Sequence, residues 1–326
     1  MFPSKPLQRP LRVVFFGTPE FAAICLQEVL KSRHTIAGVV TAPDRKAGRG
    51  QKLQQSAVKS IAQHERLPVL QPTNLKNEAF NGALETWNAD VYLVVAFRML
   101  PECVWNAPPY GTINLHASLL PQLRGAAPIQ WAIRYGFKTT GVTTFSLQHQ
   151  IDTGDILKQA SVQIDPTENA SSLHDKLLSR GKTLLVETLE ELAAGALKSA
   201  PQLDQSMDQS VLHAPKLNRE NTRVDWTKGA ENVRNMINGL SPFPKAWTSS
   251  PHGDIKLIRA SSLKTPVVST GENIPGLAIA HRNSLCIWCS DDWIQIDELT
   301  PPGKKSMQGG AWLNGLTADP GIWGMT

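Results

Sequence analysis

The sequence has 326 residues, of which 41% are hydrophobic, and this length exceeds what one core usually supports, so we expect two domains. The 33 Lys and Arg residues against 28 Asp and Glu give a net charge of +5, which permits an anionic partner without requiring one. Four cysteines in a chain this long do not make a disulfide framework, so the composition excludes a disulfide-stabilised secreted scaffold.

The first ten residues are interrupted by prolines and charges, which is not the pattern of a signal peptide. No apolar run approaches the roughly 20 residues that span a bilayer. We therefore expect no membrane association and a cytoplasmic protein.

Up to residue 96 the chain alternates buried strands with amphipathic helices, which predicts an α/β domain with a mostly parallel sheet. Between the first strand and the first helix we expect Thr18 to cap the helix and Pro19 to occupy its first turn. The turn lacks the GxGxxG pattern, so we infer no dinucleotide. The predicted strands cover residues 11–16, 36–41, 68–72 and 91–96, and the predicted helices cover 56–65 and 77–87.

A basic loop follows the second strand. Residues 43–59 contain five Lys or Arg residues against a single acidic residue, Asp44, so most of the excess positive charge is concentrated there. A solvated charged loop is the default interpretation of such a segment. Glycines beside arginines, however, allow backbone and guanidinium to approach a phosphate together, which indicates an anion site.

Residues 111–128 contain the side chains that point to chemistry. On a strand, Ile113 and Leu115 would enter the core while Asn114 and His116 leave the opposite face together. An amide donor beside an imidazole that can be charged is suited to holding an oxyanion as an acyl carbon becomes tetrahedral. A polar strand end without a catalytic role is the common alternative, but the turn-rich loop that follows is where α/β sheets bind ligands. We therefore expect acyl transfer.

Residues 114–121 read Asn-Leu-His-Ala-Ser-Leu-Leu-Pro, and they resemble the Asn-x-His-x-Ser-Leu-Leu-Pro signature of the formyltransferases that use 10-formyltetrahydrofolate. The resemblance implies a Rossmann-like catalytic domain and 10-formyltetrahydrofolate as co-substrate. It also implies catalysis by Asn114, His116 and Asp152, in which Asn114 and a protonated His116 donate to the formyl oxygen and Asp152 keeps His116 charged.

The same resemblance implies two binding surfaces and a cis peptide bond before Pro121. The first surface is the segment that ends the strand at 91–96 and continues to Pro101, which we call the wall of the folate site. It is one residue shorter than the family's usual Ala-Tyr-Gly-x-Ile-Leu-Pro and has Arg98 where Gly is common. Pro-Asp-Arg-x-Ala-Gly-Arg-Gly in the basic loop is typical of members that formylate the methionine on initiator tRNA, so we expect initiator methionyl-tRNA as partner, and a monomer. Folate binding is assigned to Phe97, Arg98, Met99, Leu100, Ser118, Leu119, Leu120 and Pro121, and tRNA binding to Arg45, Lys46, Gly48, Arg49, Gly50 and Lys52.

A strand at 141–148 and a leucine-rich amphipathic helix at 171–194 complete the first domain. The composition then turns to Ser, Gln, Asp, Ala and Pro, which is a linker signature. We predict a catalytic domain over residues 1–206, a linker over 207–215 and a C-terminal domain over 216–326.

The C-terminal part has a predicted helix at 231–240 and then short strands separated by Gly and Pro turns, which indicate a small β-barrel. Val224-Asp-Trp226 resembles the family's OB-like, tRNA-binding domain. The Trp residues of this C-terminal part are candidates for stacking on RNA bases, although a role in the hydrophobic core is at least as common. Cys286 and Cys289 have metal or redox spacing but lie in an apolar strand-like run without a second pair, so we expect core residues and no metal.

Two other functions remain open from the sequence. An enzyme with the same catalytic core and another amine acceptor, such as a sugar nucleotide, would need only a different substrate loop, and the basic loop argues against it. A nucleic-acid-binding module would account for the barrel and the basic loop but would leave Asn114, His116 and Asp152 without a role.

Overall fold

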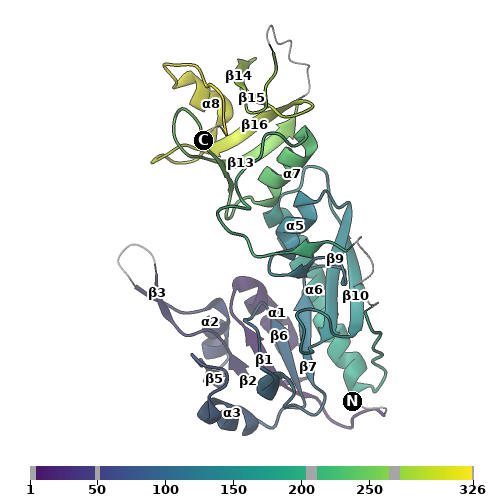
Figure 1. The fold of residues 1–326 in the computed structure, drawn as a ribbon. Helices are drawn as coiled ribbons and strands as arrows, with labels where there is room; N and C mark the ends of the chain where they lie inside the picture. The colour runs from purple at the N-terminus through teal and green to yellow at the C-terminus, as the bar shows by residue number, and fades with distance from the viewer. Residues whose placement is uncertain (1–4, 48–51, 203–210, 264–271, 325–326) are drawn as a thin grey trace. The chain divides into compact units, whose positions relative to one another are not determined.

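The computed structural model describes residues 5–47, 52–202, 211–263 and 272–324 (Figure 1). The chain forms two compact units. Unit 1 comprises residues 1–124, 141–162 and 176–212, and unit 2 comprises 125–140, 163–175 and 213–326. This division differs from the sequence-based boundaries because helix α5 (Pro128–Arg134) packs against helix α7 (Ala230–Gly239), which groups both helices in unit 2.

The seven strands of the main sheet are β1 (Arg12–Gly17), β2 (Thr35–Val40), β5 (Val69–Leu70), β6 (Val91–Val95), β7 (Thr112–His116), β9 (Thr139–Ser146) and β10 (Ile156–Gln163). Their order is β10-β9-β7-β6-β1-β2-β5. β1 pairs in parallel with β2 and β6, β2 with β5 and β6 with β7, whereas β9 joins β7 antiparallel. The predicted Rossmann-like, mostly parallel sheet is therefore confirmed.

The strand order reverses between β1 and β6, since β2 and β5 extend the sheet on one side of β1 and β6 and β7 extend it on the other. Open α/β sheets bind ligands at such a switch point, outside the carboxyl ends of the strands. The backbones pack closely there: a Cβ added to Gly17 would lie 2.6 Å from the Cβ of Ala22 and 3.1 Å from the carbonyl oxygen of Val95. The site is therefore expected where β1, β6 and β7 end.

Besides α5, the helices that precede residue 194 are α1 (Glu20–Leu30), α2 (Ala57–His64), α3 (Glu78–Glu85), α4 (Glu102–Trp105) and α6 (Ala170–Ala193). The expectation that Thr18 caps α1 is wrong: Pro19 is the N-cap, without a side-chain cap bond, because its backbone is extended and the helix starts only at Glu20. The predicted core role of the leucines on α6 is confirmed, because Leu173, Leu177, Leu184, Leu185, Leu189 and Leu192 are all buried.

Unit 2 contains an antiparallel sheet and a short C-terminal helix. Its elements are β12 (Ala246–Thr248), β13 (Ile255–Ser262), β14 (Ala278–His281), β15 (Ser284–Trp288), β16 (Trp293–Thr300), β17 (Met307–Gln308) and α8 (Gly309–Asn314). The strand order is β12-β13-β16-β15-β14, with β17 paired to β16. Within the predicted linker, His213–Ala214 form a short strand, β11, that pairs with β8 (Arg124–Gly125).

The mostly aliphatic core of unit 2 contains a cluster of three tryptophans. The rings of Trp226 and Trp312 each meet Trp323 edge to face, at centroid distances of 6.3 Å and 5.5 Å, and all three side chains are buried. These tryptophans therefore fill the core and do not stack bases. Cys286 and Cys289 are also fully buried, and burial raises the pKa of their thiols to about 11 and about 12.

No helix within the described ranges has both the length and the hydropathy needed to cross a bilayer.

Candidate active site

Strand β7 presents Asn114 and His116 at the carboxyl edge of the sheet. Ile113 and Leu115 are buried in the core, as their alternation predicts. Asn114 lies between Val94 of β6 and Phe145 of β9 in the strand register. The Asn114 side chain is half-buried and its amide makes no hydrogen bond to the residues that the structure describes. That amide is therefore free to bind a ligand.

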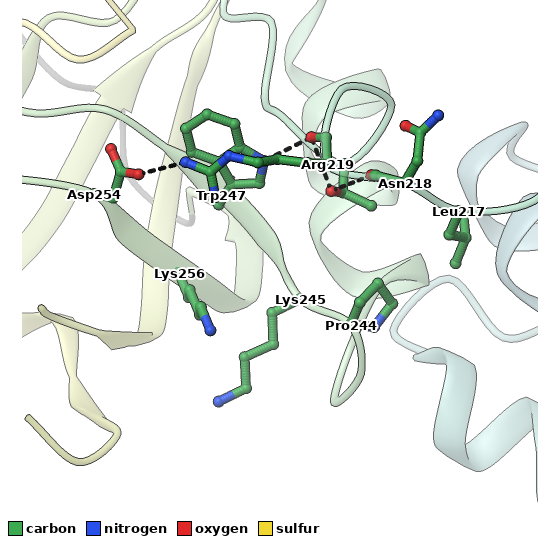
Figure 2. Close-up of a pocket in the computed structure, with 9 residues that line it drawn as sticks. Leu217, Asn218, Arg219, Pro244, Lys245, Trp247, Asp254 and Lys256 are labelled. Carbon is green, nitrogen blue, oxygen red and sulfur yellow. Dashed lines mark hydrogen bonds and ion pairs between the residues drawn. The ribbon is translucent and has the colours of Figure 1, made fainter. Parts of the chain in front are cut away.

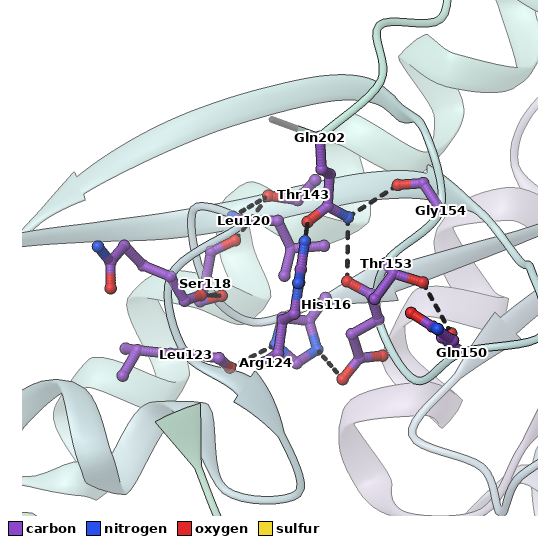
Figure 3. A network of polar contacts seen from close by, with 12 residues as sticks. His116, Ser118, Leu120, Leu123, Arg124, Thr143, Gln150, Thr153, Gly154 and Gln202 are labelled. Carbon is purple, nitrogen blue, oxygen red and sulfur yellow. Dashed lines mark hydrogen bonds and ion pairs between the residues drawn. The ribbon is translucent and has the colours of Figure 1, made fainter. Parts of the chain in front are cut away.

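The imidazole of His116 has an acceptor beside each nitrogen (Figure 3). Its Nε2 lies 2.9 Å from the carbonyl oxygen of Leu123, and a carbonyl only accepts, so Nε2 carries a proton. Its Nδ1 lies 3.8 Å from Oδ2 of Asp152, and these side chains are only 8% and 12% exposed. Asp152 and His116 are thus brought together in a site with little solvent screening.

The loop that carries Asp152 has a constrained backbone. Asp152 itself adopts a left-handed conformation, with φ of +54°, which is uncommon for a residue other than glycine. Two residues later, a Cβ on Gly154 would lie 1.6 Å from the carbonyl oxygen of Ser146, so only glycine fits. The neighbouring Ile151 is 58% exposed. The loop therefore places a carboxylate beside His116 and an apolar side chain toward solvent.

Gln202 connects this loop to the signature segment. Its Nε2 donates to the carbonyl oxygens of Asp152 (3.0 Å) and Gly154 (2.7 Å). Its Oε1 accepts from Nε (3.1 Å) and Nη2 (2.6 Å) of Arg124, the residue after Leu123. Burial lowers the pKa of Arg124, while the negative charge of Asp152 opposes that shift. Sequence reasoning missed Gln202, because it lies in a polar, linker-like stretch without a motif.

Buried side-chain hydrogen bonds stabilise the Leu-Leu-Pro loop at residues 119–121. Its Leu120–Pro121 bond is cis, as predicted. Oγ1 of Thr143 donates to the carbonyl oxygen of Ser118 and accepts from the amide of Leu120. The Ser118 side chain is fully buried and its hydroxyl donates to the carbonyl oxygen of Gln122 at 2.6 Å. Ser118 therefore stabilises the loop from within.

Residues 97–100, the wall that follows β6, include side chains that brace neighbouring loops and one apolar side chain that is exposed. Phe97 packs against Phe16, with ring centroids 5.7 Å apart. The guanidinium of Arg98 donates to the carbonyl oxygens of Pro72 and Thr73, so it braces the loop that follows β5. Met99 is 69% exposed. Among the apolar residues assigned to this wall, Met99 thus offers the most open surface to a ligand, whereas Leu100 is buried.

The predicted basic loop contains a β-hairpin formed by β3 (Arg45–Ala47) and β4 (Lys52–Gln54). Arg45 and Lys46 are exposed. Asp44 at its base is bound by Nζ of Lys59 (2.6 Å) and Nε2 of Gln71 (2.8 Å). The Lys59 hydrogen bond lowers the pKa of Asp44, so this carboxylate is engaged at the base of the hairpin. Gly48, Arg49 and Gly50 lie outside the described residues, and Lys52 is described only by its backbone.

Unit 2 has a pocket of about 320 Å³ beside the start of β12 (Figure 2). The guanidinium of Arg219 lies over the indole of Trp247, 3.9 Å from the ring centroid, and is paired with Asp254 at 2.7 Å. Lys245 and Lys256 also line the pocket. Three cationic groups against one carboxylate leave the lining with a net positive charge.

Comparison with known proteins identifies the family. Residues 11–189 match the formyl transferase family, and residues 216–317 match the formyl transferase C-terminal domain. Over 310 residues, or 94% of this chain and 95% of the relative, the chain is 44% identical to a methionyl-tRNA formyltransferase of Bacteroides fragilis. The chain belongs to the methionyl-tRNA formyltransferase family. A second member, from Flavobacterium johnsoniae, is 44% identical over 94% of this chain and 96% of its own length.

Solved structures share the fold of this formyltransferase at low identity. HypX from Aquifex aeolicus, solved with tetrahydrofolic acid, matches with a TM-score of 0.62 and 19% identity over 94% of this chain and 47% of that chain. An N-formyltransferase from Helicobacter canadensis, solved with folinic acid and dTDP-3-aminofucose, matches with a TM-score of 0.63 and 18% identity over 88% and 98% of the two chains.

The site of this formyltransferase thus contains the free side-chain amide of Asn114 and the imidazole of His116, which faces an acceptor at each ring nitrogen. Both side chains lie at the carboxyl end of β7. Together they can stabilise negative charge that develops on an acyl oxygen.

Proposed function

We propose that this protein transfers the formyl group of 10-formyltetrahydrofolate to the α-amino group of methionyl initiator tRNA, giving N-formylmethionyl-tRNA and tetrahydrofolate. The observation that carries the chemistry is the free amide of Asn114 two residues before His116, whose two ring nitrogens both face acceptors. The acceptor substrate is inferred from the 44% identity to methionyl-tRNA formyltransferases over nearly the whole chain.

In the proposed reaction the methionine nitrogen attacks the formyl carbon, and the carbonyl oxygen becomes an oxyanion. Asn114 donates to that oxygen. Because Nε2 of His116 is bound to Leu123, the second donor is Nδ1–H of a protonated His116. Each donor of this kind is worth about 2.7 to 4 kcal/mol.

The intermediate then collapses with cleavage of the bond between the formyl carbon and N10 of the folate. N10 takes up one proton and the attacking nitrogen loses one. The carboxylate of Asp152, which lies beside the imidazolium, accepts the proton of the attacking nitrogen through a water molecule and passes it on to N10, so that it is ionised again at the end of the reaction. The distance of 3.8 Å between Asp152 and His116 supports this pairing.

We assign the folate to the carboxyl ends of β1, β6 and β7, within residues 1–206. The switch point of the sheet and the exposed Met99 support this position. Phe97, Leu100, Leu119, Leu120 and Pro121 complete the wall in this proposal, while Arg98 and Ser118 support it through backbone contacts.

We assign tRNA contacts to the hairpin and to the pocket of unit 2. Arg45 and Lys46 are exposed on β3, and the nearby Asp44 is already paired with Lys59. The pocket adds Lys245 and Lys256, which suit a phosphate of the RNA backbone. RNA contacts within residues 216–326 would increase affinity, because His116, Asn114 and Asp152 all lie outside this segment.

One experiment separates the candidate acceptors. The protein is incubated with 10-formyltetrahydrofolate and either methionyl initiator tRNA or an amino-sugar nucleotide, and the formylated product is quantified. We expect product only with methionyl-tRNA. Formylation of the sugar nucleotide alone would replace the proposal with the sugar acceptor, and binding of tRNA without formylation of either acceptor would favour a nucleic-acid-binding module.

A further inference from the structure

Gln202 completes a closed ring of contacts around His116 (Figure 3). From Nε2 of His116 the ring runs through the carbonyl oxygen of Leu123 to the adjacent Arg124, then through Gln202 to the loop of Asp152. It closes at Nδ1 of His116. Gln202 is its bridge between the two segments that contact the imidazole.

The bridging amide uses both of its ends. The NH2 group donates to two carbonyl oxygens of the Asp152 loop, at 3.0 Å and 2.7 Å, and the oxygen accepts from two nitrogens of Arg124, at 3.1 Å and 2.6 Å. Two backbone acceptors and one cationic donor require a side chain that donates and accepts in one plane. Glutamate has no donor when ionised, and it would add a second negative charge near Asp152.

The Asp152 loop needs such a restraint. Asp152 has φ of +54°, a conformation that persists only where the surroundings impose it. The donated hydrogen bonds of Gln202 act on the carbonyl of that same residue and on that of Gly154. Arg124 supplies the fixed end, since its neighbour Leu123 is fully buried and donates its amide to the carbonyl oxygen of Leu212 at 2.7 Å.

We propose that Gln202 is a positioning residue for formyl transfer: it sets the separation between Asp152 and Nδ1 of His116. This inference rests on the proposed function, because it assumes that His116 and Asp152 act as a pair. Gln202 touches neither substrate. Its loss therefore affects the chemical step and leaves the affinities for folate and tRNA unchanged.

The test uses the full-length protein with Gln202→Glu and Gln202→Leu. Gln202→Glu keeps the shape and the acceptor for Arg124 but loses both donors to the Asp152 loop. Gln202→Leu loses all four hydrogen bonds. The matched control is Gln295→Leu, since Gln295 is also half-buried and its Nε2 donates to Oδ1 of Asp297 at 2.7 Å, in unit 2.

Single-turnover rates of methionyl-tRNA formylation, KM for both substrates and thermal midpoints are measured for every variant. A misplacement of about 1 Å can cost on the order of 100-fold in rate, so we expect a loss of about 10- to 100-fold in kcat for both Gln202 variants, with KM unchanged. Both Gln202 variants should lose some thermal stability but remain folded at the assay temperature, and the control should keep its rate. A Gln202→Glu protein with wild-type kcat would overturn the inference, as would a rate loss that only follows the thermal midpoint.

A crystal structure of Gln202→Glu gives a readout that does not depend on which amine substrate receives the formyl group. The separation between His116 Nδ1 and Asp152 Oδ2 should widen from 3.8 Å. An unchanged separation would overturn the positioning role, even if another amine were the substrate. Failure of the wild-type protein to formylate methionyl-tRNA would instead overturn the proposed function, and the crystal structure would still decide on Gln202.

Discussion

The carbonyl oxygen of Leu123 lies 2.9 Å from Nε2 of His116 and fixes the orientation of the imidazole. Leu123 is fully buried, so this acceptor is not exchanged for water. One ring nitrogen is therefore committed to the protein, and in the proposed reaction Nδ1 alone is left to serve both the Asp152 carboxylate and the formyl oxygen.

Removing either oxyanion donor should slow the chemical step. We expect Asn114→Ala and His116→Ala each to lower the single-turnover rate by about 10² to 10³, because each removes a donor that acts on developing charge. Folate binding, followed by fluorescence titration, should be unchanged. His149→Ala is the control, since His149 is exposed and has no assigned role. A His116→Ala protein with a near wild-type rate would contradict the mechanism.

The hairpin should govern the salt dependence of tRNA binding. Each phosphate contact contributes about 0.7 to 0.9 to the slope of log affinity against log salt, so Arg45→Ala with Lys46→Ala should flatten that slope by about 1 to 2. Arg45→Lys should restore only part of the loss, because Lys lacks the planar fork of Arg. Filter binding across a salt series measures the slope, with the exposed Lys76→Ala as control. An unchanged slope in the double variant would remove the hairpin from the tRNA site.

The pocket of unit 2 should add affinity without affecting chemistry. Lys256 is exposed and lines the pocket, so Lys256→Ala should weaken methionyl-tRNA binding, and Lys256→Glu should weaken it further by repelling phosphate. The rate at saturating tRNA should not change. Lys305→Ala, an exposed lysine of the same unit that is not among the pocket residues, serves as control. Equal tRNA affinity for Lys256→Ala, Lys256→Glu and wild type would show that the pocket does not face RNA.

The stability of unit 1 should depend on the ionisation of Asp90. Burial disfavours the charge of Asp90, but hydrogen bonds from the Arg9 side chain, at 2.7 Å for each carboxylate oxygen, and from the Arg12 amide outweigh it and lower the pKa of Asp90. A lowered folded-state pKa stabilises the protein above the unfolded value of about 3.9, and this contribution is lost as the pH falls through the folded value.

Asp90→Asn should therefore cost about 1.5 to 3 kcal/mol at pH 7, as expected for hydrogen bonds to a charged group. The difference from the wild type should shrink below about pH 4. Urea unfolding at pH 7, 5 and 3 measures it, with the exposed Asp175→Asn as control. A difference that does not change with pH would mean that the carboxylate charge contributes nothing.

Local patterns in the sequence predicted most of the elements. Continuous apolar runs identified β1, β2 and β6, because parallel strands covered on both faces are hydrophobic throughout. The leucine spacing of α6 identified its buried face. Strand β10 was missed because it lies at the edge of the sheet and its buried and exposed residues do not alternate regularly.

The sequence by itself determined that Asn114 and His116 share one strand at a ligand-binding edge, since the period of a strand is a local property. Only the tertiary structure decided what holds them in place. Gln202 is 78 residues from Arg124 and 50 from Asp152, and no local pattern brings such groups together. The same holds for Arg98, which binds carbonyl oxygens 25 and 26 residues away. Hydrogen-bond partners at such separations depend on the order of the strands and on the path of the loops between them.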